Sequence, residues 1–170
     1  MQPLNRRQWL ALSGAASAAA LAGCGFRLRG TGTGQQQYPF RSLYISGAAT
    51  AMVKEIKRLL AGYVQVTSKA ADAEVVLTVL TDREQRSASA ISTSAQVREV
   101  ELLQLFDFSL ADTNGHILID ASPIQIRRFV SYREYEAAAK ESEFELLLRD
   151  MRTDVARQVL RRLAAAKPAS

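Results

Sequence analysis

The stretch that decides the fold is Glu99-Val100-Glu101-Leu102-Leu103-Gln104-Leu105-Phe106-Asp107-Phe108-Ser109-Leu110, followed by Ala111-Asp112-Thr113-Asn114-Gly115. Glu99, Glu101 and Asp107 lie on one face, and the apolar side chains on the other face are Val100, Leu102, Phe106, Phe108 and Leu110. This period of two predicts a β-strand with one face against a core. Asn114-Gly115 is a strong short-range signal for a hairpin turn. We therefore expect residues 117–130 to return beside this strand, with Pro123 at an edge or a bulge.

Upstream of the hairpin the pattern predicts a strand, a helix and two further strands. The helix has an apolar stripe at helical spacing, and Gly62 follows its end as a C-terminal cap. The composition then changes to Ser, Ala and Thr over 86–94, which indicates a strand end or a mobile loop. The predicted ranges are 43–45 (strand), 50–61 (helix), 63–67 (strand) and 74–81 (buried strand).

Downstream, a long amphipathic helix is predicted from an apolar stripe that runs from Phe144 to Val159. Ser142 and Glu145 have the spacing of a capping box, so the regular helix is expected to begin at Glu143. This order of elements predicts an α+β fold. The expected architecture is a two-layer sandwich, with a mixed, mostly antiparallel sheet of about four to five strands and two helices on one face.

The first residues are expected to direct export. Arg6-Arg7 precede an uncharged run over 9–22, which is shorter than the about 20 residues a spanning helix needs. The run closes on Leu21-Ala22-Gly23-Cys24, which resembles the lipobox of bacterial lipoproteins. That resemblance implies cleavage before Cys24 and a covalent lipid on it, an S-diacylglycerol and an N-acyl chain such as palmitate. General and twin-arginine export both remain open.

We expect four segments along the chain: a lipoprotein signal peptide (1–23), a lipid-anchored flexible tether (24–41), a single α+β domain (42–166) and a C-terminal tail (167–170). The tether is predicted from its Gly, Gln and Pro content. By resemblance to lipoprotein sorting rules, Gly25 after the cysteine favours the outer membrane, with the body in the periplasm.

Composition excludes several classes of protein. The chain has 170 residues, one Cys and one His, so an intramolecular disulfide is excluded and a structural zinc site is not favoured. The formal charge of +5 falls to +3 without the signal peptide, too weak a bias to indicate nucleic-acid binding. His116 follows the predicted turn, where a solvated position is expected, and no hydrolase motif occurs. We therefore expect no enzyme, no catalytic residue and no metal site.

Three segments could carry binding: 24–30, Arg127-Arg128-Phe129 with Arg133, and 137–141. Basic groups next to a membrane can contact lipid phosphates. Arg127 and Arg128 should point to opposite faces of a strand. Small residues over 137–139 would let another chain or acyl tails approach closely. For each segment, ordinary solvated charge or helix propensity is the alternative explanation.

Two further segments are distinctive: Cys24-Gly25-Phe26-Arg27-Leu28-Arg29-Gly30, and the stretch from Arg128-Phe129 through Ala138-Ala139-Lys140 to the helix end at Val159-Leu160-Arg161-Arg162-Leu163. Together they resemble the LptE family of lipopolysaccharide-assembly lipoproteins. The resemblance implies a non-enzymatic plug and assembly partner of the LptD β-barrel in the outer membrane. It also implies binding of lipopolysaccharide during delivery to the cell surface.

For lipopolysaccharide contact, the resemblance favours Lys140 first, then Arg128 and Arg133. Thr93 and Ser94 stand in the loop where some relatives have an arginine, so Arg98 or Arg86 would have to replace that cation. The alternative function is a structural or pilotin-like lipoprotein chaperone for another outer-membrane barrel or secretin, without glycolipid binding.

Overall fold

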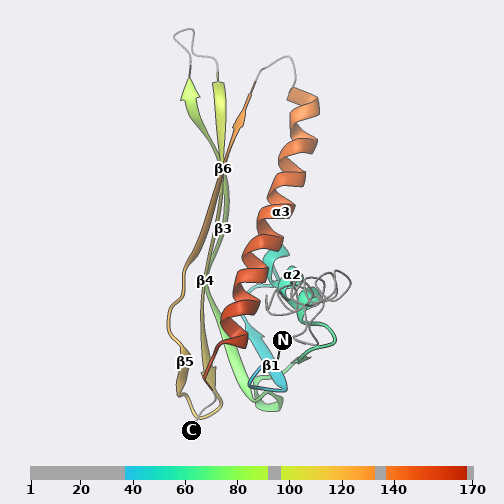
Figure 1. Cartoon of the computed structure of the whole chain (residues 1–170), viewed down its shortest axis with the longest axis vertical. Helices are drawn as coiled ribbons and strands as arrows, with labels where there is room; N and C mark the ends of the chain where they lie inside the picture. Colours follow the sequence, from blue (N-terminus) through green and yellow to red (C-terminus); the bar gives the residue numbers. More distant parts are fainter. Residues whose placement is uncertain (1–36, 92–96, 133–136, 168–170) are drawn as a thin grey trace, which may run out of the picture. The chain divides into compact units, whose positions relative to one another are not determined.

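The computed structural model describes residues 37–91, 97–132 and 137–167. Within them, a six-stranded mixed sheet carries two α-helices on one face, so the predicted α+β sandwich is confirmed (Figure 1). The strand order is β2-β1-β3-β4-β5, with β6 also paired to β4; β1 is parallel to β2 and β3, and the other pairs are antiparallel. The elements are β1 (Ser42–Ser46), α2 (Ala51–Leu60), β2 (Gln65–Thr67), a 3₁₀ turn η1 (Ala70–Asp72), β3 (Val75–Ile91), β4 (Val97–Asp112), β5 (Ile117–Ile119), β6 (Ile124–Ser131) and α3 (Ala137–Ala164).

The alternating segment forms β4, the strand with the most partners. Its even-numbered residues from Val100 to Leu110 are all buried under the helices, as the period of two predicts. β3 pairs with β4 and continues to Ile91, beyond the 74–81 predicted from the sequence. The Ser- and Ala-rich stretch up to Ile91 is therefore strand, because Ser87 and Ala88 pair with Glu101 and Val100 on β4.

The predicted hairpin turn lies where expected. Gly115 has a φ of 87°, and its N–H donates to the Asp112 carbonyl at 3.1 Å. The returning chain makes two strands rather than one, which explains a sheet of six strands instead of four to five. The Ser122 N–H donates to the Asp107 carboxylate at 2.8 Å, which holds the break beside Pro123 between β5 and β6.

The helix α2 follows the predicted pattern closely. The Thr50 hydroxyl accepts a hydrogen bond from the Val53 N–H at 3.2 Å and caps the first turn. The apolar stripe is buried against the sheet and α3. Gly62 follows the last turn with a φ of 87°, a conformation that glycine adopts without strain.

The helix α3 begins at Ala137, earlier than the Glu143 predicted from the capping box. Alanine has the highest helix propensity, and the ion pair between Lys140 and Glu143 at spacing i,i+3 supports the added turns. α3 therefore reaches along β3, β4 and β6 to the end of the sheet at which β3 ends and β4 begins (Figure 1). We call this the distal end.

Two hydrophobic clusters hold the layers together. The main core joins α2, the second half of α3 and the sheet around β1, and it includes Phe106 and Phe108. Tyr38 and Phe40 also pack there, although the sequence placed both in the tether over 24–41. The distal cluster joins the first half of α3 to β4 and β6 and consists of Val100, Leu102, Val130, Phe144 and Met151. Among the described residues, no helix has the length and hydropathy needed to cross a membrane.

Candidate functional site

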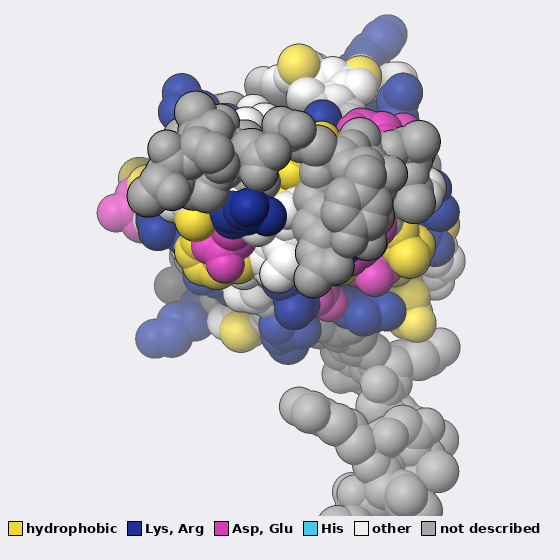
Figure 2. Space-filling model, turned by 90° about the horizontal axis from the view of Figure 1, so that it is seen from above, with side chains coloured by type: hydrophobic (Ala, Val, Ile, Leu, Met, Phe, Trp, Pro, Cys, Tyr) yellow, Lys and Arg dark blue, Asp and Glu magenta, His cyan; other side chains and the backbone are white. Residues whose placement is uncertain are grey.

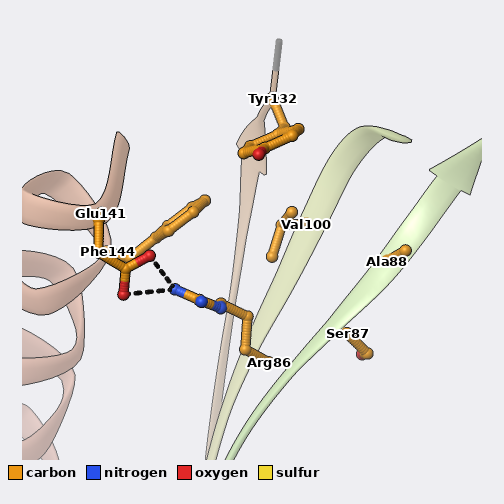
Figure 3. A pocket seen from close by; sticks show the side chains of 7 residues that line it. All are labelled: Arg86, Ser87, Ala88, Val100, Tyr132, Glu141 and Phe144. Carbon is orange, nitrogen blue, oxygen red and sulfur yellow. Dashed lines mark hydrogen bonds and ion pairs between the residues drawn. The ribbon is translucent and has the colours of Figure 1, made fainter. Parts of the chain in front are cut away.

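A hollow of about 320 Å³ opens at the distal end, between the sheet and the first turns of α3 (Figure 3). Its size is at the lower limit of small-molecule sites, which span roughly 300–1,000 Å³. Seen from this end, basic side chains lie beside apolar and acidic ones (Figure 2). The hollow is lined by Arg86, Ser87 and Ala88 of β3, Val100 of β4, Tyr132 after β6, and Glu141 and Phe144 of α3.

The strand register explains why these side chains meet. Arg86 pairs with Leu102, and Ala88 pairs with Val100, so these residues share the face that α3 covers. Phe144 is 3% exposed and packs in the distal cluster, and its ring stacks on Tyr132 with centroids 6.3 Å apart. The floor of the hollow is therefore apolar, and its contour is set by packed side chains.

Arg86 supplies the positive charge at the rim. Its Nη1 donates to both oxygens of the Glu141 carboxylate, at 3.0 and 3.1 Å. The guanidinium carbon also lies 4.9 Å from the centre of the Phe144 ring, within the range of a cation–π contact. The side chains of Arg86 and Glu141 are 43% and 57% exposed, so solvent screens this pair and a ligand can reach it.

Two of the cations that the resemblance favours, Lys140 and Arg128, have carboxylate partners of their own. Lys140 Nζ lies 2.6 Å from Glu143 Oε2, and its side chain is only 19% exposed. Arg128 Nη2 lies 3.8 Å from Asp154 Oδ2 of α3, on the helix-covered face. Arg127 points to the opposite face, as predicted, where its Nε lies 3.5 Å from Glu101. The structure thus pairs Lys140 and Arg128 with different acids and places neither among the lining residues of the hollow.

Several predicted residues lie outside the described residues: Cys24, Thr93, Ser94 and Arg133. Arg98 is described, and its carbonyl accepts a hydrogen bond from the Tyr132 N–H at 2.9 Å. Of the two arginines named as replacements for the missing loop cation, Arg86 is the one that reaches the hollow.

The sequence placed Glu141 in the candidate binding segment 137–141 but gave its carboxylate no role. Sequence reasoning missed Tyr132, and it treated Phe144 as a core residue only. The helix stripe correctly placed Phe144 on the buried face, but the position of Arg86 over its ring depends on strand register. The extension of α3 to Ala137 was the missing step, because it places Glu141 one turn before Phe144 and opposite β3.

Among the described residues, the site offers an apolar hollow with an accessible cation, Arg86, at its rim. A second cation, Lys140, lies on the same helix turn as Glu141 and Glu143. Such a combination suits a ligand that carries both an apolar chain and an anionic group.

His116 lies away from this hollow, in the hairpin turn that follows β4. It is exposed, and its Nδ1 is 3.0 Å from Asp112 Oδ2.

Comparison with known proteins gives a family and a set of related folds. Residues 40–163 match the family model described as LptE, lipopolysaccharide-assembly. No curated protein sequence matches the chain.

Several solved structures share the fold, among them three lipoproteins. An uncharacterized lipoprotein B from Nitrosomonas europaea is 27% identical and gives a TM-score of 0.70, covering 83% of this chain and 91% of its own. The rare lipoprotein B from Shewanella oneidensis is 26% identical with a TM-score of 0.62, covering 74% of this chain and 95% of its own. A minor lipoprotein from Acinetobacter baumannii, 22% identical with a TM-score of 0.60, covers 77% of this chain and 97% of its own and shows the same fold. Because the family model spans most of the folded residues, the chain belongs to the LptE family of lipopolysaccharide-assembly proteins.

Proposed function

We propose that this protein is a non-enzymatic outer-membrane lipoprotein of the lipopolysaccharide translocon. In this proposal a covalent lipid on Cys24 anchors the chain at the periplasmic side. The folded domain acts as plug and assembly partner of an LptD-type β-barrel, and it binds lipopolysaccharide during insertion into the outer leaflet. Membership of the LptE family and similarity to bacterial lipoproteins support this role.

The observation that carries the binding part is the distal hollow. Lipopolysaccharide joins phosphate groups to acyl chains, and the distal end offers apolar side chains together with Arg86 and Lys140. Guanidinium and ammonium groups are the usual protein partners of phosphate. Lys140, Arg128 and Arg133 remain the phosphate contacts that the family resemblance proposes.

Titration of the purified mature protein with lipopolysaccharide tests this function. We expect Lys140→Asp to weaken binding about tenfold, because it removes a charge-assisted contact and adds repulsion. Thermal stability should stay near that of the wild type, since an i,i+3 pair contributes only about 0.2–0.5 kcal/mol. Lys54→Asp makes the same charge change on the exposed side of α2 and should leave binding unchanged.

The pilotin-like alternative predicts a different result. If the protein is a chaperone that never contacts glycolipid, the wild type should not bind lipopolysaccharide at any lipopolysaccharide concentration below the onset of nonspecific adsorption. Binding that is equal in wild type and Lys140→Asp would reject the Lys140 assignment while leaving the assembly role in place.

A further inference from the structure

The cation at the rim of the hollow is already in contact with a carboxylate, and this contact would have to change when an anion binds. We propose that Glu141 is a gating residue. In this proposal it holds Arg86 in the absence of ligand, and the phosphate of an anionic amphiphile replaces it while the end of an acyl chain enters the hollow. The inference rests on the proposed function for its ligand class, a phosphate joined to acyl chains.

The geometry favours displacement of Glu141 and retention of Arg86. The guanidinium lies over the Phe144 ring, and Phe144 itself is buried and stacked on Tyr132. Glu141, by contrast, projects from the first turns of α3 with more than half of its side chain exposed (Figure 3). The arginine is thus held by packed neighbours, and the carboxylate has room to turn towards solvent.

The chemistry of the two anions also favours exchange. Both hydrogen bonds to the Glu141 carboxylate come from one nitrogen, Nη1 of Arg86. A phosphate that engages two nitrogens of the planar guanidinium gains a two-pronged contact that Glu141 does not make. An exposed ion pair changes an equilibrium by no more than about fivefold, so its loss opposes binding only weakly.

The volume of the hollow limits how much of the ligand's apolar part can enter. The lining beneath Arg86 is formed by Val100, Phe144, Tyr132 and Ala88. At about 320 Å³ the hollow has room for the end of one acyl chain and not for a whole multi-chain lipid body. We therefore infer that a single chain end enters, with the remaining chains outside.

The test uses the full mature protein reconstituted in phosphatidylcholine nanodiscs. Affinity is measured for purified lipopolysaccharide, for the same material after removal of its phosphates, and for phosphatidylglycerol. The first and third ligands separate glycolipid from acidic phospholipid as the source of the phosphate. Thermal unfolding of each variant establishes that it is folded.

The two members of the ion pair should respond in opposite directions. We expect Arg86→Gln to weaken binding of the phosphorylated ligand about tenfold or more. We expect Glu141→Gln to strengthen it about two- to fivefold, because the competing carboxylate is gone. Glu55→Gln removes the carboxylate of another glutamate–arginine pair, with Arg58 on α2, and should leave affinity unchanged.

A third variant tests the hollow without a change of charge. Ala88→Leu should fill the space beside Val100 and weaken binding of acylated ligand at least fivefold, with no effect on a deacylated phosphosugar. Affinity that is unchanged or lower in a folded Glu141→Gln protein overturns the gating role, even if the wild type binds lipopolysaccharide and the proposed function stands. Absence of any binding by the wild type overturns this inference and the ligand of the proposed function together.

Discussion

Phe144 is the side chain on which the distal end depends, so its replacement by alanine is the most informative perturbation of the fold. It is 3% exposed and lies in the distal cluster, where it joins the first half of α3 to β4 and β6. Its ring also stacks on Tyr132 and lies beneath the Arg86 guanidinium. Phe144→Ala should therefore loosen α3 from the sheet at the site itself.

The expected loss of stability can be estimated from these contacts. Truncation of a buried phenylalanine to alanine costs about 3–5 kcal/mol. That figure includes the aromatic pair, about 0.5–1.5 kcal/mol, and the exposed cation–π contact, about 0.5–1 kcal/mol. Because Phe144 borders an open hollow that water can fill, we expect the lower end, about 3 kcal/mol. Phe108→Ala is the matched control in the main core, where the fully buried ring should cost about 4–5 kcal/mol.

Urea unfolding followed by circular dichroism gives both free energies, and hydrogen exchange locates the change. For Phe144→Ala we expect the largest loss of amide protection in β6 and in the first half of α3. A loss of less than about 1 kcal/mol would show that α3 does not pack on the distal sheet as described, and the hollow would lose its floor.

Three further changes test other parts of the structure. Gln104→Leu should stabilise the protein by about 1 kcal/mol in urea unfolding, because Gln104 is 1% exposed and its Oε1 has no partner among the described residues. A loss of stability would show that the hydrogen bonds of its Nε2 outweigh the cost of burying the unpaired Oε1. Glu55→Gln should reduce acid sensitivity. The hydrogen bond from Arg58 lowers the pKa of Glu55 below its ordinary value of 4.5. The stabilisation from the ionised Glu55 is therefore present above pH 4.5 and is lost as the pH falls through the lowered pKa. Parallel stability curves for wild type and Glu55→Gln from pH 6 to pH 2 would contradict this. Arg162→Ala should lower the free energy of unfolding by about 1–2 kcal/mol, because the Arg162 guanidinium donates to the Ser122 and Pro123 carbonyls at the break between β5 and β6. An unchanged urea midpoint would show that these hydrogen bonds do not stabilise the break.

Periodicity predicted the elements that bury a continuous face and missed those that depend on a partner. The period of two in β4 and the helical stripe of α2 both report burial directly, so these elements were predicted correctly. The end of β3 up to Ile91 has few apolar residues, and only its pairing with β4 makes it strand. The first turn of α3 from Ala137 was missed for a similar reason, since a capping pattern at Ser142 competed with the propensity of the alanines.

The site could be predicted only in part, because the partners of its charged side chains are set by the three-dimensional fold. The sequence shows that Lys140 and Arg128 are basic, but not that each lies beside a carboxylate contributed by α3. Nor does it show that Arg86, in a stretch rich in Ser and Ala, lies over an aromatic ring. These contacts join residues distant in sequence or on successive turns of a helix whose start was misplaced, so they require the strand register and the true start of α3.

The central proposal is that this LptE-family chain is a component of the lipopolysaccharide translocon. Affinity purification of the mature protein from native membranes tests it most directly. We expect recovery of a large LptD-type β-barrel in equal amount with the protein, with lipopolysaccharide in the same complex. Recovery of the protein without such a barrel, or with a secretin in its place, would contradict this role.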